Sequence, residues 1–420
     1  MTTAVGLLLV LLGGHYAYRL ASWSWGLQRE ARRPAPEPSE WPRLSVVVAA
    51  RNEEDAIGAC LDALLAQDYP ADRIEILVAD DDSTDRTASI VRETMLTANV
   101  RATPLPVLAT PGAAPSQTES APGMGDGAVG DGAAAPHERV RLVRVPHDPA
   151  RLRAHKKRAI ETAVAQARGE IILTTDADCL APPAWARTLA APFADPDVAF
   201  VSGPVRYRLE RGPFLRLQAL DFFALMLAGA GAIAQGEPHL ANGASVAYRR
   251  SVFRHLGGFS GIDDITSGDD ELLMQKVAYG AMGPGAVRAA VRPDATVVTE
   301  GVRTARALLD QRTRWASKGG RYPLRLKGML GLGLAFFVLL FASALALPAW
   351  PALLPWVLGA LALRVGADLA LLVPGARLFG QSRLLGTYPL FLLVHIPAAL
   401  GMGVLGAFGD FEWKGRRLDR

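Results

Sequence analysis

Two carboxylates, Asp176 and Asp178, follow the short apolar run 171–174. Side chains at positions i and i+2 beyond the end of a strand can both reach one cation. Oxygen ligands suit Mg²⁺ or Mn²⁺, and such an ion would bridge the oxygens of a diphosphate. An isolated Asp-x-Asp is often only a polar turn, so its meaning depends on the other acidic groups of the chain.

Three further acids, Asp80, Asp81 and Asp82, follow the apolar run 74–79. Ligands of open parallel sheets bind beyond the carboxyl ends of the strands, where acidic side chains can hydrogen-bond a base or a ribose. Capping of the next helix is the alternative interpretation, because Ser, Thr and Asp are preferred caps. One member of the group can serve as a cap, but three consecutive aspartates exceed what capping needs.

A third acidic group, Asp269, Asp270 and Glu271, precedes another apolar segment. One of these carboxylates could act as a general base if its surroundings raise its pKa. The alternative is a capping box, in which Ser267 is the cap and Asp270 is its partner three residues later. Both interpretations can hold together.

Cationic and aromatic side chains complete the set of candidates. Lys156 lies in the basic run 155–158 at a predicted helix start, where it could contact phosphate or a carboxylate. A solvated helix face is the alternative. Arg314 could stabilise a diphosphate leaving group and Trp315 could stack on a sugar, or both could anchor the chain at a membrane surface.

The elements that would position these residues alternate in type. Strands are predicted at 44–49, 74–79, 140–145 and 171–174, and helices at 54–67, 84–97 and 156–167. This order is typical of an α/β domain with a parallel sheet and covering helices. The run 101–137, rich in Pro, Gly and Ala, is predicted to be a flexible insertion without chemistry.

The composition indicates a chain that is part globular and part membrane-embedded. Half of the residues are hydrophobic and the mean hydropathy is +0.17. Only 20% are charged, which excludes disorder throughout. The formal charge of +4 does not indicate nucleic acid, and none is expected as a partner. Two cysteines, Cys60 and Cys179, exclude a disulfide scaffold, and both are expected to be reduced.

Four apolar runs approach the length needed to span a membrane. They lie at 3–18, 328–347, 351–373 and 385–408. Basic residues directly after the first run predict that its C-terminal side is cytoplasmic. Three C-terminal spans would then place the basic tail outside, against its preference for the cytoplasm. We therefore expect one run not to cross, and the proline-broken run 385–408 is the candidate.

Two apolar segments contain charged residues, and each suggests where its segment lies. Arg364 and Asp368 are four residues apart, so they share a helix face and could pair inside a bundle. The run 214–234 contains Arg216 and Asp221, and we expect an interfacial or acceptor-facing helix near the membrane. The predicted organisation is a transmembrane helix at 1–27, a linker at 28–43, a cytoplasmic domain at 44–322, membrane or interfacial helices at 328–409 and a basic tail at 410–420.

Taken in order, these motifs resemble those of the family 2 inverting glycosyltransferases of the GT-A fold. The layout is similar to their membrane branch, which includes cellulose synthase-, hyaluronan synthase- and ceramide glucosyltransferase-like enzymes. The resemblance runs from about Leu44 to Trp315, with Asp82 where the family usually has glycine. The matching segments are VVVAARNEE (46–54), VADDDSTD (78–85), KKRAIE (156–161), TDADC (175–179), ANGASVAYRRSVFRHLGGF (241–259), SGDDELL (267–273) and QRTRW (311–315).

The resemblance implies a Rossmann-like GT-A domain that binds a nucleotide-diphosphate sugar, most often a UDP-sugar, together with Mg²⁺ or Mn²⁺ held by Asp176 and Asp178. The nucleotide-sugar contacts that it implies are Ala50, Arg51, Glu53, Asp80, Asp81, Lys156, Asp176, Gln311, Arg314 and Trp315. The family's catalytic Glu-Asp pair is not present as such. One alignment makes Asp269 the base and the other makes Asp270 the base; we favour Asp269.

The function that the resemblance implies is transfer of a sugar to a lipid or glycan acceptor by an integral protein of the inner or plasma membrane. Three C-terminal runs leave little protein for a polymer channel, which favours a lipid or lipid-linked acceptor over a processive polysaccharide synthase. A catalytically silent membrane scaffold that binds nucleotide sugars is the alternative from another class. The retained acidic set argues against it, because a scaffold does not need metal ligands and a base together.

Overall fold

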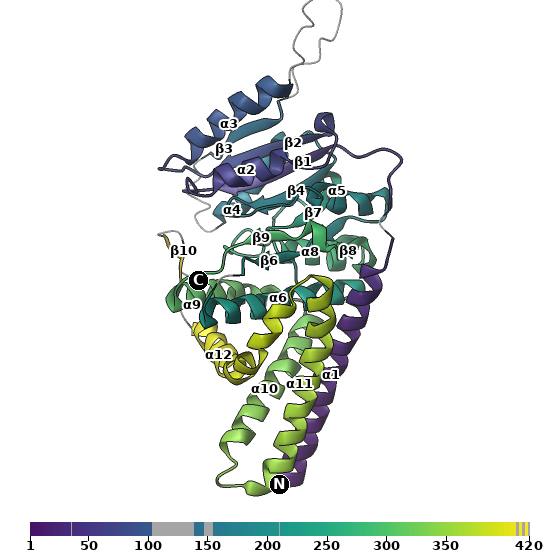
Figure 1. Cartoon of the computed structure of the whole chain (residues 1–420), viewed down its shortest axis with the longest axis vertical. Coiled ribbons are helices and arrows are strands. Elements are labelled where there is room, and N and C mark those ends of the chain that lie inside the picture. The colour runs from purple at the N-terminus through teal and green to yellow at the C-terminus, as the bar shows by residue number, and fades with distance from the viewer. Residues whose placement is uncertain are drawn as a thin grey trace, which may run out of the picture.

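The computed structural model describes residues 1–34, 36–102, 138–146, 154–209, 211–408, 411–413 and 416–418. These residues form an α/β domain and a group of long helices at one end of it (Figure 1). The predicted insertion at 101–137 lies outside the described residues, apart from its first two, which end a helix. The tail is described only as two short strands, β10 (Phe411–Trp413) and β11 (Arg416–Leu418).

A seven-stranded sheet in the order β3-β2-β1-β4-β7-β5-β8 forms the centre of the domain. Its strands are β1 (Leu44–Ala50), β2 (Ile74–Asp80), β3 (Val140–Arg144), β4 (Ile171–Asp176), β5 (Phe200–Ser202), β7 (Val246–Arg249) and β8 (Val287–Ala289). The four predicted strands are confirmed, and they pair in parallel as expected. β7 runs antiparallel to both β4 and β5, which the sequence did not predict.

The register of the parallel strands decides which residues meet at the sheet edge. Ala50 pairs with Asp80 across β1 and β2, and Ala49 pairs with Asp176 across β1 and β4. The three strands therefore end at the same level, and the loops that follow them lie together. These strands are buried along almost their whole length, which explains their continuous apolar sequences.

Further helices belong to the domain. They are α2 (Ile57–Leu65), α3 (Thr87–Ala102), α4 (His155–Gln166), α5 (Trp185–Ala190), α7 (Arg250–His255) and α8 (Glu271–Gln275), and a second small sheet pairs β6 (Val205–Tyr207) with β9 (Val297–Thr299). The three predicted helices are present with shifted ends. α4 packs against β1 and β2, so its first turn lies near the ends of both strands.

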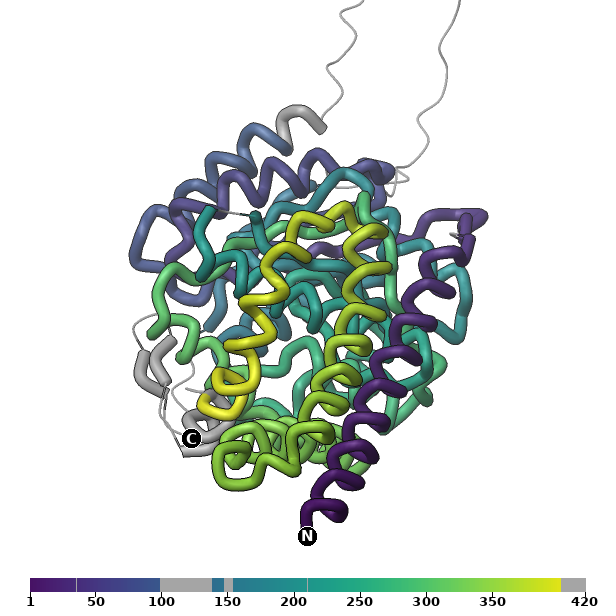
Figure 2. The backbone as a smooth tube through the Cα atoms, turned by 60° about the horizontal axis from the view of Figure 1, so that its bottom comes forward, coloured from purple at the N-terminus to yellow at the C-terminus, as the bar shows by residue number. Residues whose placement is uncertain are grey.

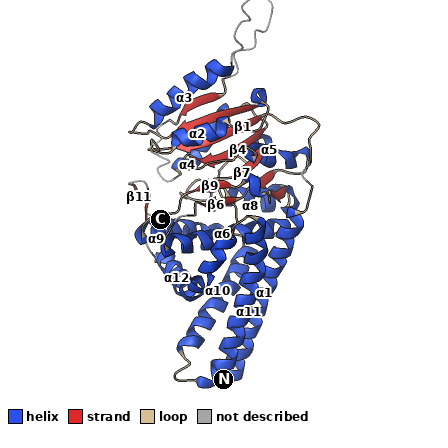
Figure 3. Ribbon diagram, viewed as in Figure 1, coloured by secondary structure: helices blue, strands red, loops and turns tan. Residues whose placement is uncertain are grey.

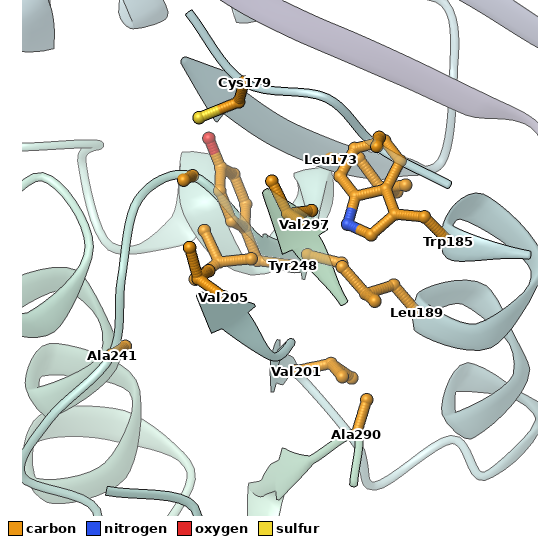
Figure 4. Close-up of a cluster of buried hydrophobic side chains, with 14 of the residues drawn as sticks. Leu173, Cys179, Trp185, Leu189, Val201, Val205, Ala241, Tyr248, Ala290 and Val297 are labelled. Atoms are coloured by element: carbon orange, nitrogen blue, oxygen red, sulfur yellow. The ribbon is translucent and has the colours of Figure 1, made fainter. Parts of the chain in front are cut away.

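The core beside β4 and β7 combines small and aromatic side chains. Trp185 is fully buried, and its indole N–H donates to the Ser245 hydroxyl at 3.0 Å. Figure 4 shows Trp185 packed near Leu173 and the Tyr248 hydroxyl pointing toward the Cys179 thiol. This packing lies next to the loop after β4. That loop carries Asp178.

The long helices are α1 (Thr2–Ala31), α6 (Pro213–Ala234), α9 (Ala305–Ala316), α10 (Leu324–Leu345), α11 (Leu354–Leu378) and α12 (Tyr388–Phe408). All of these except α9 are long and apolar enough to cross a membrane, by length and composition. α1, α10 and α11 extend away from the sheet as a stalk, while α6, α9 and α12 lie at the end of the domain (Figures 1 and 3). Figure 2 shows α1 and α11 side by side, in agreement with their contacts.

The first helix is longer than the sequence predicts. It continues unbroken through Arg19 and past residue 27 to Ala31. Arg19 lies within it, as expected of a good helix former. Its guanidinium forms an ion pair with Glu237, which also accepts from the indole N–H of Trp23 at 3.4 Å. The helix therefore reaches from the stalk into the domain and packs on α6.

α6 matches the predicted helix at 214–234, and it packs on α1, β6 and β8. The predicted pair inside the bundle is present: Arg364 Nε lies 3.6 Å from Asp368 Oδ2, and both side chains are buried. Tyr16 and Tyr388 also donate to Asp368, at 2.5 Å and 2.9 Å. These contacts satisfy charges that would be costly in an apolar bundle.

Candidate active site

Asp176 ends β4, and Asp178 lies in the turn that follows. One oxygen of each carboxylate and the Cys179 sulfur lie within 4.8 Å of one another. Burial, together with the two carboxylates, raises the pKa of the Cys179 thiol well above its ordinary value, so the thiol stays protonated. The two carboxylates fit a hard divalent cation, and the protonated thiol is not expected among its ligands.

Lys156, in the first turn of α4, joins two acidic groups that are distant in sequence. Its Nζ lies 2.7 Å from Asp176 Oδ1 and 2.9 Å from Asp269 Oδ2. Burial lowers the pKa of Lys156, but Asp176 and Asp269 outweigh that effect and raise it above its ordinary value. Lys156 is therefore a permanent cation that holds the end of β4 next to the segment before α8.

Asp269 and Asp270 have different surroundings. Asp270 Oδ1 accepts from the Glu271 N–H at 2.6 Å, and its Oδ2 accepts from the Gly243 N–H at 2.7 Å. Asp269 instead contacts Lys156 in the cavity described below. Burial by itself would raise the pKa of Asp269, but Lys156 and then Lys157 hold it below its ordinary value, so the raised pKa considered for a base in this group is not found at Asp269. Both oxygens of Asp270 accept backbone N–H groups, whereas Asp269 pairs with the Lys156 side chain.

The predicted capping box at this position is wrong. The N-cap of α8 is Asp270, not Ser267, and the helix begins at Glu271. Gly268 explains the difference, because its φ of +88° lies in the left-handed region and ends any helical path from Ser267.

A glycine, Gly243, forms part of the cavity wall between these groups. A Cβ atom at this position would lie 3.0 Å from Asp269 Oδ2 and 3.0 Å from Lys156 Nζ. Such contacts are tighter than ordinary van der Waals contact, so the backbone approaches the charged pair as closely as it can. Gly243 lies in the segment 241–259, which is one of those that carry the family resemblance.

Asp81 is buried and already bound by cations. Its carboxylate lies 2.7 Å from Arg158 Nη2, 3.4 Å from His155 Nδ1 and 3.7 Å from Arg51 Nη1. Asp80 Oδ1 accepts from the Ser83 N–H at 3.2 Å. Asp80 thus stabilises the loop after β2, and Asp81 connects that loop to the first turn of α4.

Asp82 and Asn52 both have positive φ values, +60° and +52°. Asp and Asn tolerate this left-handed region better than other residues except glycine, which explains why Asp82 can stand where glycine is usual. Asn52 joins the two loops, because its Oδ1 accepts from the Thr84 N–H at 2.9 Å and its N–H donates to Ser83 Oγ at 3.1 Å.

The predicted residues Gln311, Arg314 and Trp315 lie on α9. Thr304 caps this helix by accepting from the Ala307 N–H at 3.2 Å. Burial lowers the pKa of Arg314, although Asp269 and other acids act in the opposite direction. A guanidinium stays charged even so, and Arg314 is therefore a partly buried cation beside the acidic groups.

Arg312, between these residues, holds α9 on α6. It forms an ion pair with Asp221, and its guanidinium carbon lies 4.6 Å from the centre of the Trp315 ring. On the other side, the Tyr207 hydroxyl donates to Gln311 Oε1 at 3.4 Å. These contacts orient the side chains that α9 directs into the site.

A cavity of about 440 Å³ joins these groups. It is lined by Ala50, Arg51, Glu53, Asp81, Lys156, Asp176, Asp178, Asp269, Asp270, Gln311, Arg314 and Trp315. All of them are predicted site residues. Asp80 is the predicted residue that does not line the cavity, because it lies at the end of β2 and bonds to the Ser83 backbone.

Sequence reasoning missed Lys318 and Tyr322 and assigned no role to Glu271, although all three line the cavity. Lys318 Nζ lies 2.7 Å from Glu271 Oε2, and both side chains are almost fully buried. Burial raises the pKa of Glu271, while Lys318 and a hydrogen bond from Tyr322 act against that. The one available signal was that Glu271 belongs to an acidic run; nothing in the spacing connects it to Lys318.

Comparison with known proteins identifies the family. Residues 45–103 match "Glycosyl transferase family 2", and residues 171–395, more than half of the chain, match "Glycosyl transferase family group 2". The chain belongs to glycosyltransferase family 2. The second match extends from β4 into α12, so it includes long apolar helices as well as the cavity.

Among solved structures, the family 2 chain is similar to mannosyltransferase PcManGT from Pyrobaculum calidifontis, which was solved in complex with GDP-Man and Mn²⁺. The TM-score is 0.51 at 25% identity, over 95% of this chain and 99% of that one. This likeness covers the domain and the long helices, and it confirms the predicted GT-A fold with apolar helices at both ends.

Two curated relatives match over short segments. The chain is 47% identical to beta-monoglucosyldiacylglycerol synthase of Synechocystis over 51 residues, which are 12% of this chain and 11% of that protein. It is 48% identical to the probable glycosyltransferase YdaM of Bacillus subtilis over 54 residues, 13% of each. The matched segments thus span about a tenth of the length of these relatives.

Proposed function

We propose that this chain transfers a sugar from a nucleotide-diphosphate sugar to a lipid acceptor at a membrane surface. The observation that carries the proposal is the arrangement in one cavity of a carboxylate pair at Asp176 and Asp178, the Lys156–Asp269 pair and the partly buried cation Arg314. These groups match the requirements of diphosphate departure and acceptor deprotonation. Residues of α6 complete the cavity with an apolar wall.

The donor binds at the edge where β1, β2 and β4 end. Arg51 and Glu53 border the nucleotide side, and Asp81 fixes that side through Arg51 and Arg158. Asp176 and Asp178 would hold a divalent cation, which offsets charge on the departing diphosphate. Arg314 supplies a second positive charge for the diphosphate, with the rigid fork geometry that suits phosphate oxygens.

Asp269 is the proposed base. Its carboxylate accepts the proton of an acceptor hydroxyl while the hydroxyl oxygen attacks the anomeric carbon on the face opposite the diphosphate. The bond from that carbon to the diphosphate breaks, and the configuration inverts. Asp270 is less suited to this role, because both of its oxygens accept backbone N–H groups.

Membrane attachment is proposed from the five long apolar helices. The domain would lie at the cytoplasmic face of a cell membrane, with the end of α6 near the lipid surface. A relative named as a glucosyldiacylglycerol synthase supports a lipid acceptor. The similar mannosyltransferase was solved with GDP-Man, so a guanosine donor stands beside the expected uridine donor.

The test is donor turnover by the full chain purified in detergent. A panel of UDP- and GDP-sugars is offered with Mg²⁺ or Mn²⁺ and membrane lipid extract, and release of nucleoside diphosphate is measured. We expect release from one donor that stops on chelation of the metal and returns when Mn²⁺ or Mg²⁺ is added. NMR of the labelled product reports whether the anomeric configuration is inverted.

The same experiment separates the alternatives. A ladder of products of increasing length would identify a processive polysaccharide synthase. Nucleotide binding without release from any donor would identify a silent scaffold. Asp178→Asn is the matched variant for the metal: we expect it to raise the metal concentration needed for half-maximal turnover, since it removes one charged oxygen ligand.

A further inference from the structure

The cavity has two chemically different walls. Charged groups form much of its lining, and an apolar group, Phe222, Leu225 and Met226 of α6 together with Leu240, forms another part of it. The three α6 residues have the spacing i, i+3 and i+4, so they share one face of the helix. α6 itself lies at the end of the domain that carries the long apolar helices (Figure 1).

The apolar wall reaches the proposed base through a short segment. Leu240 is three residues before Gly243, whose backbone borders Asp269 and Lys156 so closely that an added Cβ would lie 3.0 Å from each. Asp269 and the α6 face line the same cavity, so an acceptor whose hydroxyl lies at Asp269 can extend its apolar part along that face. A lipid, with a small head group and long apolar chains, fits this arrangement.

The cations of the cavity show what the head group can be. Lys156 is paired with Asp176 and Asp269, and Lys318 is paired with the buried Glu271 at 2.7 Å. A phosphate acceptor needs charge-assisted donors to replace its water. Both lysines beside the base are already committed to carboxylates.

Arg314 is the exception among the lining cations. No described carboxylate lies within 4.0 Å of its guanidinium. In the proposed reaction this cation pairs with the donor diphosphate, because the charge that develops on the leaving group must be compensated. A second phosphate, on the acceptor, would have to compete for it.

We infer that the acceptor is a lipid with an uncharged hydroxyl head group, of the diacylglycerol or neutral glycolipid class, and not a lipid phosphate; the inference rests on the proposed function. The acceptor O–H bond breaks and its proton passes to Asp269. The acceptor oxygen forms the new bond to the anomeric carbon, and the electron pair of the old bond leaves on the nucleoside diphosphate.

The test compares acceptors that differ only in the phosphate. The full chain is placed in phosphatidylcholine vesicles with its labelled donor and either diacylglycerol or phosphatidic acid of identical acyl chains. A long-chain prenyl alcohol and its monophosphate form a second pair. We expect label to enter diacylglycerol at least tenfold faster than phosphatidic acid, and the alcohol faster than its phosphate.

Each other outcome has one meaning. Equal or faster labelling of the phosphates overturns the inference. Donor turnover that labels neither kind of lipid also overturns it, while the proposed sugar transfer chemistry stands. Absence of donor turnover under every condition overturns the proposed function itself, so the two failures are distinguishable.

A substitution in the α6 face tests whether the acceptor binds there. Met226→Lys adds a cation to the α6 face, and we expect it to raise the KM for diacylglycerol at least fivefold, and by a larger factor than the KM for the donor. Leu96→Lys, at an exposed position of α3 far from the cavity, is the matched control. An unchanged KM in Met226→Lys would contradict acceptor binding at this wall, and intact nucleotide binding verifies that the variant is folded.

Discussion

Asp269 and Asp270 are neighbours in sequence, yet their carboxylates do different work. Asp270 satisfies two backbone N–H groups, and such groups are costly to leave unpaired when buried. Asp269 instead pairs with the Lys156 side chain. The choice between them could not be made from the sequence, because it depends on which carboxylate accepts the backbone N–H groups of Gly243 and Glu271.

The first prediction concerns this pair. Asp269→Asn should lower sugar transfer by at least about 100-fold, as expected for loss of a general base, with nucleotide binding retained. Asp270→Asn should instead lower thermal stability, because one oxygen acceptor is lost at the start of α8. Initial rates and thermal unfolding of both variants check this. Retained transfer in Asp269→Asn would assign the base to Asp270.

Lys157 gives a pH prediction. Its ammonium donates to the carbonyls of Ile262, Ile265 and Ser267, at 2.8 Å for the last two, and so holds the segment that leads to Asp269. Burial lowers the pKa of Lys157 to about 8. Protonation is complete well below that value, and a neutral amine has only two protons for three carbonyls.

Transfer should therefore fall as pH rises through about 8, the value to which burial lowers the pKa of Lys157. A pH–rate profile at saturating donor checks this. Lys157→Arg, which stays protonated, should extend activity to higher pH if the larger side chain is accommodated. If the transfer rate falls at the same pH in Lys157→Arg and in the wild-type chain, the loss of activity at high pH belongs to another group.

At the scale of elements, the strand ends and α4 assemble the donor side, while α8, α9 and the loop before β7 add the acceptor side. Lys156 of α4 joins the two sides, because it pairs with Asp176 and with Asp269 beside Gly243. Within the acceptor side, Glu271 of α8 pairs with Lys318. Gly243 and the Glu271–Lys318 pair each give a prediction.

Gly243→Ala should reduce transfer by at least tenfold, because the new Cβ would press on Asp269 and Lys156. Gly280→Ala is the matched control, since nothing lies within 4 Å of a Cβ at that position. Steady-state rates of the two variants are compared at equal folded fraction. Normal rates in Gly243→Ala would show that the charged pair can move without loss.

Glu271→Gln should destabilise the protein by about 3–5 kcal/mol, since it leaves the buried Lys318 ammonium without its carboxylate. Replacing both partners, as in Glu271→Met with Lys318→Met, should recover a large part of this loss. Denaturant unfolding in detergent of Glu271→Met, Lys318→Met and the double variant measures the double-mutant cycle. Additive effects of the two single changes would show that the pair is not coupled.

At the scale of the whole molecule, the first helix is joined to the site. Arg19 of α1 pairs with Glu237 at the start of the loop that continues to Leu240 and Gly243. Trp23 donates to the same carboxylate, and Arg325 at the start of α10 lies 3.4 Å from it. The stalk and the acceptor wall therefore share one charged contact.

Arg19→Ala should lower both stability and transfer, because the loop that carries Gly243 loses its tie to α1. We expect a rise in the KM for the lipid acceptor that exceeds any change in the KM for the donor. Arg92→Ala, at an exposed site on α3, is the control. Equal effects on both KM values would indicate general destabilisation instead of a specific effect on the acceptor side.

The sequence by itself determined the local elements and the residue types of the site. Continuous apolar runs are buried strands because both faces of the parallel sheet are covered, and acids directly after such runs must lie at one edge. The apolar runs likewise determined the long helices. These features depend on residues that are close together in the sequence. Hydrophobic periodicity and spacing were therefore sufficient to predict them.

The tertiary structure decided what depends on contacts between distant segments. It separated Asp269 from Asp270, bound Asp81 to Arg158, and brought Lys318 onto Glu271. It also paired Arg19 of α1 with Glu237, more than two hundred residues away. No local pattern encodes these pairs, since the energy of a buried charge is set by partners that only the folded chain brings within reach.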